Sequence, residues 1–439
     1  FYRVARFFFA ERVSTYALMI MALSPFHIWY AQEARVYALA SFLSLAMLYA
    51  FLMAVRDNRW WQWLVFSVAG ALALMATYFN IFILLLLPVY LKFGPYRNRF
   101  RNWLLAMLMM GVLCAPLWPL VTAQLDFVQK DFWLPEPSPV VALFTGLIFS
   151  LGYSGSIVQY AAGLVIFGIL FVWGLYRLIV TDWVKALFLG LLFLLPLVLV
   201  YVISHHLTPV YINRQLLIFS PFYYLLVAQG IDAVPSPKDR RIALICVLLL
   251  FGTCLFNYYR NYMFEHPSRA EYFTGVVPKK NYREQLDYVA QNFQEGDLVA
   301  VTDTQAHVML FSYLLHLQRE GTPLAFEQAR YYLFPHLLQR FDNRFLRLQD
   351  LLAYISADEQ NQLQTFIPAP NGAMIYEDKE LEEQAFRRIW LVSSAWNNSG
   401  EEKRMLSINS LHVRSIFDKL FKKSEKRVKD GVYVELYEK

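Results

Sequence analysis

Blocks of about 20 mostly apolar residues follow one another through the first 260 or so residues of the chain. A helix needs about 20 such residues to cross a hydrocarbon core of about 30 Å. Of the 439 residues, 57% are hydrophobic and 17% are charged, whereas soluble domains are typically about a quarter charged. The chain is therefore predicted to be an integral, multi-pass membrane protein.

The apolar runs predict nine spans and one shorter helix. The spans are expected at about 14–30, 36–55, 60–77, 79–92, 102–123, 156–175, 184–204, 214–232 and 241–259. The run from Val140 to Leu151 is too short to cross comfortably and follows a proline-rich stretch. It is predicted to form a re-entrant or interfacial helix.

The distribution of basic residues sets the expected orientation. With residues 140–151 not crossing, one side of the membrane receives fourteen Lys and Arg in its short loops, and the other receives Arg35, Lys130 and Arg214. The richer side is expected to be cytoplasmic. Nine crossings then place the tail outside the cytoplasm. The basic excess lies in these loops, so nucleic-acid binding is not expected.

The tail is predicted to be a small extracytoplasmic α/β domain, giving a membrane domain at 1–262 and a second domain at 263–439. Apolar or alternating runs at 297–303, 388–394 and 432–437 predict strands. Helical spacing predicts helices at 282–293, 306–317 and 337–355. The basic run from Lys422 to Lys429 is interpreted as a solvated helix face. Strands alternating with helices are typical of a sheet covered by helices.

A turn between two expected spans, from Leu23 to Tyr37, carries the most informative residues. A proline, two aromatic residues and a Gln-Glu-x-Arg cluster meet there. Glu33 and Arg35 lie where hydration is incomplete, and such groups need a partner or a ligand. The alternative is that both simply pair with neighbours within an aromatic belt. The chain has no Gly-rich phosphate loop and no GxSxG, HExxH or CxxC motif, which argues against a nucleotide-using enzyme or a zinc protease.

Three segments, in this order, resemble the GT-C superfamily of polytopic glycosyltransferases. They are Ser24-Pro25 with Tyr30 to Tyr37, Ala76 to Phe79, and Tyr211 to Arg214 continuing through Pro221. The chain is most similar to the prokaryotic branch of the protein-mannosyltransferase and aminoarabinose-transferase family, glycosyltransferase family 39. The resemblance covers essentially the whole chain and implies a location in a prokaryotic cell (inner) membrane.

This resemblance implies a polyprenyl-phosphate sugar as donor and transfer to a protein, lipid or glycan acceptor at the outer face of the membrane. In the family, a carboxylate in the first outer loop acts as general base. The resemblance implies that the chain begins just before the third span of a typical member, so its catalytic residue is not assigned. Arginine suits a leaving phosphate because it can grip two oxygens. The donor-binding candidates are Glu33, Arg35, Tyr37, Tyr78 and Arg214.

The remaining candidates have less support from sequence. Asp126 and Asp131 are expected in an outer loop, where they could contact the acceptor or a divalent cation. His205 and His206 end a span on the same side, and adjacent imidazoles point in different directions on a helix, so no metal site is assigned to them. For Arg214 the alternative is interfacial snorkelling. The alternative functions are a polytopic transporter or flippase and a membrane-anchored assembly protein of envelope polysaccharide synthesis.

Overall fold

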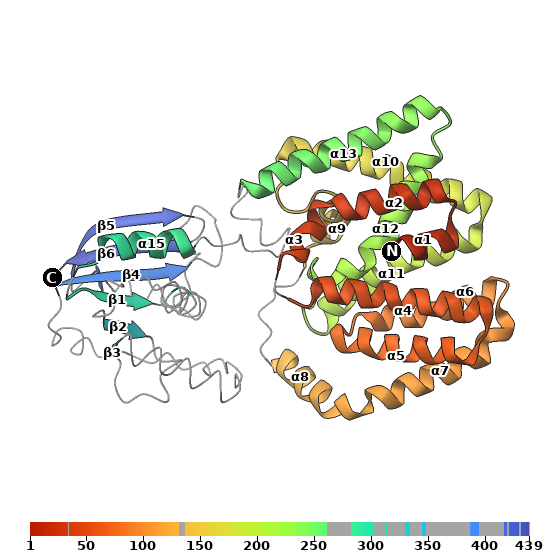
Figure 1. Ribbon diagram of the computed structural model, residues 1–439, viewed down its shortest axis with the longest axis horizontal. Helices are drawn as coiled ribbons and strands as arrows, with labels where there is room; N and C mark the ends of the chain where they lie inside the picture. Colours follow the sequence, from red (N-terminus) through yellow and green to blue (C-terminus); the bar gives the residue numbers. More distant parts are fainter. Residues whose placement is uncertain are drawn as a thin grey trace. The chain divides into compact units, whose positions relative to one another are not determined.

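The computed structural model describes residues 1–33, 35–130, 137–260, 282–294, 296–301, 313, 330–333, 345–347, 387–394, 417–418, 421–429 and 432–438. The chain divides into two compact units. The described residues up to Arg260 lie in the first unit, which is helical, and those from Tyr282 onward lie in the second, which contains a β-sheet (Figure 1).

The first unit is a bundle of helices of unequal length. These are α1 (Tyr2–Phe8), α2 (Glu11–Leu23), α3 (Pro25–Ala31), α4 (Tyr37–Asp57), α5 (Trp60–Ala76), α6 (Asn80–Phe93), η1 (Arg97–Arg99), α7 (Phe100–Cys114), η2 (Ala115–Leu117), α8 (Trp118–Lys130), α9 (Pro139–Leu151), α10 (Ile157–Thr181), α11 (Trp183–His206), η3 (Gln215–Phe219), α12 (Ser220–Asp232) and α13 (Pro237–Tyr259). Helix α12 is buried along almost its whole length.

Among the described residues, five helical segments are long and apolar enough to cross a membrane. They are Tyr37–Asp57, Arg97–Leu125, Ile157–Thr181, Trp183–His206 and Pro237–Tyr259. Three further apolar helices, α5, α6 and α9, are shorter. The membrane-spanning character of the unit is thus supported, while the count of nine spans stays a prediction. The expected short helix at 140–151 is confirmed as α9.

Two expected spans are divided in the structure. The run at 14–30 forms α2 and α3, because Ser24 accepts a hydrogen bond from the backbone N–H of His27 and Pro25 begins the new helix. The run at 214–232 forms η3 and α12, with Pro221 in the first turn of α12. A proline at the first positions of a helix costs no backbone hydrogen bond, so each division marks a new helix start.

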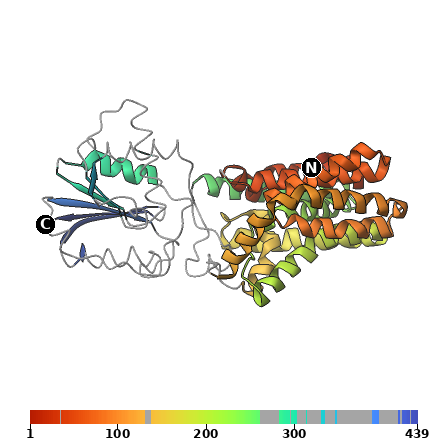
Figure 2. The same cartoon turned by 90° about the horizontal axis from the view of Figure 1, so that it is seen from below.

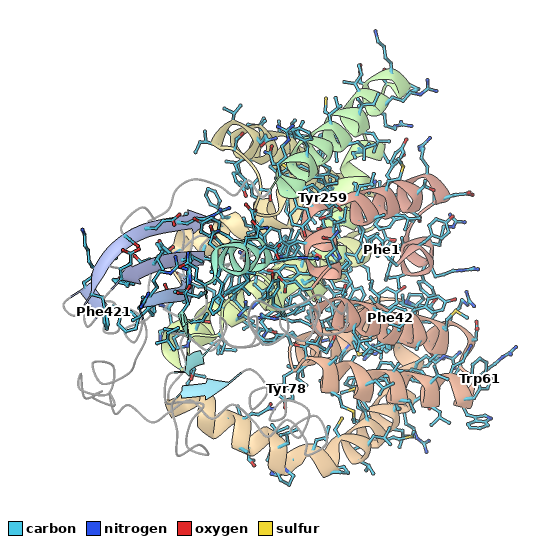
Figure 3. All side chains as sticks on the ribbon, turned by 60° about the vertical axis from the view of Figure 1, so that its left-hand side comes forward. Phe1, Phe42, Trp61, Tyr78, Tyr259 and Phe421 are labelled. Atoms are coloured by element: carbon cyan, nitrogen blue, oxygen red, sulfur yellow. The ribbon has the colours of Figure 1, made fainter. Side chains whose placement is uncertain are left out.

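Large apolar side chains cover the outside of the helical unit. Phe42 is 65% exposed and Trp61 is 44% exposed, and Figure 3 shows Trp61 on the outside of the bundle. In the segment Arg97–Leu125, which includes α7 and most of α8, only 11% of the most apolar 18-residue stretch is buried inside the protein. Exposed apolar surface on this scale is expected where the surrounding solvent is lipid.

The second unit is a six-stranded sheet in the order β3-β2-β1-β4-β6-β5. Its strands are β1 (Leu298–Val301), β2 (Arg330–Leu333), β3 (Phe345–Arg347), β4 (Arg388–Ser394), β5 (Lys422–Lys429) and β6 (Val432–Glu438). Strands β2, β1 and β4 are parallel, and the other pairings are antiparallel. Helix α15 (Tyr282–Asn292) lies across one face of the sheet (Figure 2).

The predicted α/β character of the tail is confirmed, with three expected strands found as β1, β4 and β6. The expected helix at 282–293 corresponds to α15. Strand β2 was not expected. The predicted helix at 337–355 is wrong at 345–347, which form β3, and its other residues lie outside the described part. The predicted helix at 306–317 lies outside it except for Tyr313.

The interpretation of the basic run 422–429 as a helix face is also wrong, because these residues form the edge strand β5. Its register with β6 supplies backbone hydrogen bonds, and Lys423 Nζ lies 3.0 Å from Glu435 Oε1. A run of charges is compatible with either a helix surface or a strand edge. Charged side chains on an edge strand discourage pairing with another chain.

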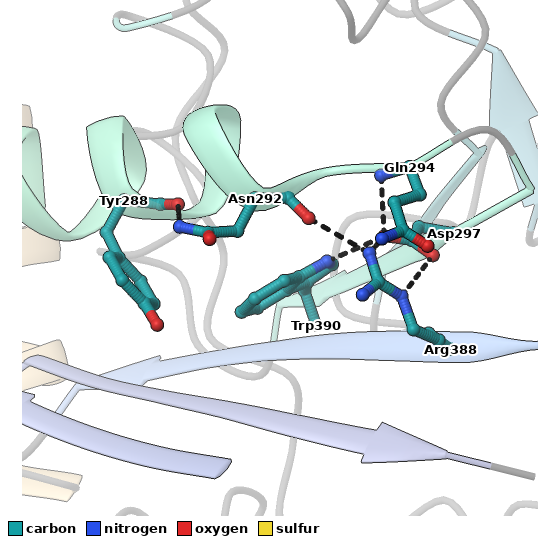
Figure 4. A network of polar contacts seen from close by, with 6 residues as sticks. All are labelled: Tyr288, Asn292, Gln294, Asp297, Arg388 and Trp390. Atoms are coloured by element: carbon teal, nitrogen blue, oxygen red, sulfur yellow. Dashed lines mark hydrogen bonds and ion pairs between the residues drawn. The ribbon is translucent and has the colours of Figure 1, made fainter. Parts of the chain in front are cut away.

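An ion pair fastens the beginning of β1 to the beginning of β4 (Figure 4). The Asp297 carboxylate accepts hydrogen bonds from Arg388 Nε, Trp390 Nε1 and Gln294 N, each at 2.9 Å. Arg388 also donates to Asn292 O at 2.9 Å. These groups lie at the amino ends of parallel strands, whereas ligands of open α/β sheets bind at the carboxyl ends. We therefore regard the network as structural.

Candidate functional site

The start of α3 is held against α9 and α12 by buried polar contacts. Ser24 Oγ lies 2.9 Å from Tyr224 OH and 3.2 Å from Phe149 O. Tyr224 OH donates to Phe149 O at 2.6 Å. Helix α3 is too short to hold its place alone, since isolated helices of this length are unstable in water. The sequence element Ser24-Pro25 thus fixes the start of α3, the helix that leads into the turn carrying Glu33 and Arg35.

His27 adds a second contact to α12 that the sequence did not indicate. Its Nε2 lies 2.7 Å from Ser220 Oγ, and Ser220 Oγ donates to Leu217 O at 2.7 Å. A hydroxyl has a single proton, so with that proton on Leu217 O the Ser220 oxygen accepts from His27 Nε2. Nδ1 is then the acceptor atom of the ring. His27 lies within the segment from Leu23 to Tyr37 that the sequence singled out, although no role was assigned to it there.

A pair of buried tyrosines lies at the centre of the charged residues. Tyr30 OH and Tyr153 OH are 2.9 Å apart, and both residues are 1% exposed. Each of these tyrosines interacts electrostatically with both Glu33 and Arg214. Two of the predicted residues, from segments about 180 positions apart, therefore lie within electrostatic range of the same pair of hydroxyl groups.

Glu33 is oriented by a stack of aromatic residues. Trp29 Nε1 donates to Glu33 Oε1 at 2.9 Å. The Trp29 ring packs edge-on against the Tyr153 ring, with 5.4 Å between centroids, and at a tilt against the Tyr258 ring, with 5.0 Å between centroids. Glu33 itself is only half-buried. A carboxylate that is fixed on one oxygen and partly accessible can accept further hydrogen bonds from a ligand.

The rest of the turn is tied to the end of α13. Tyr258 OH donates to Gln32 Oε1 at 2.7 Å, and Gln32 Nε2 donates to Tyr259 OH at 3.0 Å. Arg35 is exposed, and its backbone N–H donates to Glu33 O at 2.7 Å. Tyr37 is half-buried, with its ring 5.2 Å from that of Tyr30. The turn is thus anchored at both ends while Arg35 remains accessible.

Tyr78 occupies a different turn, between α5 and α6. Its OH donates to Gln124 Oε1 of α8 at 2.7 Å, and the residue is 47% exposed (Figure 3). The described contacts of Tyr78 are with α8 and do not include the tyrosine pair. The sequence grouped Tyr78 with the donor-binding residues, and that grouping stays a prediction.

Arg214 lies directly before η3 and is half-buried. The residues that precede it are more deeply buried: Tyr211 is 5% exposed and Asn213 is 1% exposed. Both contact Thr145 of α9, whose Oγ1 lies 2.7 Å from Tyr211 OH and 2.9 Å from Asn213 Oδ1. The segment that carries Arg214 is therefore fixed by polar contacts to α9.

The other predicted residues lie near helix ends. His205 and His206 are exposed at the end of α11, and the His205 ring packs against Tyr201 at 4.6 Å. Asp126 lies in α8, and Asp131 lies outside the described residues. Within the described ranges, no group of three His, Cys, Asp or Glu side chains is arranged to hold a metal ion. A divalent cation remains an untested expectation.

Sequence comparison finds a family match in the first part of the chain. Residues 1–120 match the family of dolichyl-phosphate-mannose-protein mannosyltransferases. These residues include the turn with Glu33, Arg35 and Tyr37 and the turn with Tyr78. No curated protein matches the chain. The resemblance to GT-C membrane glycosyltransferases is thereby supported at two of the three segments from which it was inferred.

The fold agrees with this class. The chain is similar to the crystal structure of ArnT from Cupriavidus metallidurans in the apo state, with a TM-score of 0.53 and 11% sequence identity. The similarity covers 99% of this chain and 80% of that one. Together the two comparisons confirm the predicted resemblance to GT-C glycosyltransferases, and with the membrane-capable helices they indicate an integral membrane protein.

Proposed function

We propose that this protein transfers a sugar from a polyprenyl-phosphate donor to an acceptor at the outer face of the membrane. The observation that carries the proposal is that the charges of Glu33 and Arg214 both act on the Tyr30–Tyr153 hydroxyl pair. One partner lies in the segment that matches the mannosyltransferase family, and the other lies outside it. Dolichyl phosphate, named in that family's description, is itself a polyprenyl phosphate.

Arg214 has the chemistry required by a departing lipid phosphate. Cleavage of the bond between sugar and phosphate leaves negative charge on the phosphate oxygens. A guanidinium can donate two parallel hydrogen bonds to those oxygens, and such contacts are strong where water is excluded. Arg214 is half-buried and within electrostatic range of buried tyrosine hydroxyls. Arg35 is accessible on the turn between α3 and α4 and supplies a second positive charge.

Glu33 has a different role in this proposal, because a carboxylate repels phosphate. Its second oxygen accepts hydrogen bonds from hydroxyl groups of the sugar or the acceptor, while Trp29 holds the first. The aromatic rings around it suit a sugar, whose C–H faces pack on aromatic surfaces. The acceptor is a protein, a lipid or a glycan, and Asp126, Asp131, His205 and His206 are candidates for contacting it.

The role of Arg214 is tested with two substitutions and one matched control. Arg214→Lys keeps the charge but loses the planar fork, so transfer falls while part of the donor affinity is kept. Arg214→Ala removes the charge and lowers transfer by about 10²–10³-fold, the effect of losing one preorganised donor. Arg177→Ala, at an exposed position of α10, leaves transfer unchanged.

The assay measures transfer from a polyprenyl-phosphate sugar by the full-length protein in lipid nanodiscs, with each variant's folded amount determined first. Full activity of Arg214→Ala would remove the residue from the site. Full activity of Arg214→Lys alone would restrict its role to that of a point charge. Equal activity loss in all three variants would indicate an effect on the bundle and contradict the proposal.

A further inference from the structure

Asn213 carries a buried amide whose hydrogen bonding is incomplete. The residue is 1% exposed, and its Oδ1 lies 2.9 Å from Thr145 Oγ1. Among the residues that the structure describes, its Nδ2 has no hydrogen-bond partner. A primary amide has two donor hydrogens and an acceptor oxygen, so both of its donor hydrogens lack a described partner.

Exchanging the positions of the amide oxygen and nitrogen by a flip of the amide group still leaves one of the two atoms without a described hydrogen-bond partner. The oxygen and nitrogen of an asparagine are assigned by their neighbours, and Thr145 Oγ1 can either donate to the amide oxygen or accept from the amide nitrogen. Tyr211 OH, 2.7 Å from Thr145 Oγ1, can supply the proton that the first arrangement needs. Thr145 Oγ1 can also donate to Val141 O at 3.0 Å, as the second arrangement allows. In both arrangements, one amide atom remains without a described partner.

Such a group is costly in this position. An unsatisfied buried polar atom destabilises even a soluble protein, and lipid offers no water to replace the missing partner. The neighbouring contacts of Thr145 do not depend on the amide, because Val141 O and Tyr211 OH can satisfy its hydroxyl. The asparagine is therefore not needed to satisfy the polar groups of α9. Because its unpaired amide atom destabilises the fold, we look for a role of this amide in ligand binding.

This role follows from the place of Asn213 in the chain. It directly precedes Arg214, whose charge acts on the Tyr30–Tyr153 pair. We propose that the vacant amide atom of Asn213 hydrogen-bonds a hydroxyl group of the lipid-linked sugar. A hydroxyl both donates and accepts, so it fits either arrangement of the amide, whereas a phosphate diester oxygen can only accept. This inference rests on the proposed function and assigns sugar recognition, as opposed to phosphate binding, to Asn213.

The experiment compares two lipids on the same full-length protein in detergent. One is a polyprenyl-phosphate sugar, and the other is the same polyprenyl phosphate without the sugar. Affinity is measured by ligand-induced thermal stabilisation at a series of lipid concentrations. For Asn213→Leu we expect affinity for the sugar-bearing lipid to fall at least about tenfold, the size of one hydrogen bond to a ligand. Affinity for the bare lipid phosphate is expected to stay the same.

The apo protein provides a second readout. Leucine fills a similar volume without an unsatisfied atom, so Asn213→Leu is expected to match or exceed the melting temperature of the parent. Asn257→Leu is the matched control, because Asn257 Nδ2 is engaged with Ser154 O at 2.9 Å and Gln159 Oε1 at 3.0 Å. That variant is expected to melt at a lower temperature without discriminating between the two lipids.

Several outcomes would overturn the inference. Equal loss of affinity for both lipids in Asn213→Leu would assign the amide to the phosphate, and unchanged affinity for both would remove it from the site. If the leucine variant does not fold, the amide is structural unless Asn213→Ser folds and shows the same selective loss for the sugar-bearing lipid. Failure of the parent protein to bind either lipid would instead contradict the proposed function.

Discussion

Helices α10 and α12 cross so closely that neither tolerates a side chain at the contact. A Cβ added at Gly230 would lie 1.9 Å from Leu170 O, and one added at Gly174 would lie 2.0 Å from Leu226 O. Both obstacles are backbone atoms, which cannot move away by rotating a side chain. The added carbon falls about 1.5 Å short of ordinary contact at 3.4 Å. Gly230→Ala must therefore push the two helices apart.

The size of the effect follows from where this crossing lies. Helix α12 is buried along nearly its whole length, so a displacement disturbs its packing on several sides. Overpacking a core costs about 1–3 kcal/mol, and a clash with backbone belongs at the upper end. Alanine recovers at most about 1 kcal/mol of helix propensity. We expect Gly230→Ala to destabilise the folded protein by about 2 kcal/mol.

The matched control is Gly252→Ala in α13, where an added Cβ would meet no described atom within 4 Å. It gains the same helix propensity without the clash and is expected to be neutral or slightly stabilising. Stability is measured as the free energy of unfolding in mixed micelles, followed by tryptophan fluorescence. If Gly230→Ala and Gly252→Ala were equally stable, the close crossing of α10 and α12 would be wrong.

Three further predictions concern the second unit, the site and the orientation. The Arg388 and Asp297 side chains are 18% and 3% exposed, so Asp297→Ala leaves a largely buried guanidinium without its carboxylate. The substitution should lower the local stability of β1 and β4 by about 2–3 kcal/mol. This loss is measured as faster amide hydrogen exchange in the full chain. Trp29→Phe keeps the ring but loses the hydrogen bond to Glu33, and transfer should fall about tenfold without a change in folded amount; unchanged transfer would argue against a role for Glu33. A reporter that is active only outside the cytoplasm should work when fused after Lys439, and a signal from a cytoplasm-active reporter instead would reverse the proposed topology.

The sequence predicted most of what depends on local pattern. Apolar runs located the long helices, and the shortness of the run at 140–151 correctly indicated a helix unlike the long spans. Alternating or apolar runs located β1, β4 and β6. These signals work because period and length are properties of neighbouring residues. They fail where a pattern fits two structures, as it does for the charged edge strand β5.

Helix boundaries depended on chemistry that hydropathy does not record. The runs at 14–30 and 214–232 are continuous in hydropathy but are divided at Ser24 and before Pro221. Each division places a polar residue at a helix start, where its hydroxyl can bond outside its own helix. Ser24 thereby meets Tyr224, and Ser220 meets His27. The same breaks that upset the expected span limits therefore join α3 to α12.

The candidate site shows a further limit of the sequence. Charged residues such as Glu33 and Arg214 were conspicuous because ionisable groups near a membrane are rare. Tyr153 and Thr145 were not, because an uncharged polar residue near the end of an apolar run has no distinctive pattern, and Asn213 lay in a matched segment without a role of its own. Their importance arises from pairing across about 65 to 125 positions of sequence. A fixed charge can attract a phosphate from several ångströms away, whereas one sugar hydroxyl is distinguished from another only by short directional contacts. The residues proposed to bind the common part of the donor are accordingly visible in the sequence, and those proposed to select its sugar become visible only when the fold is known.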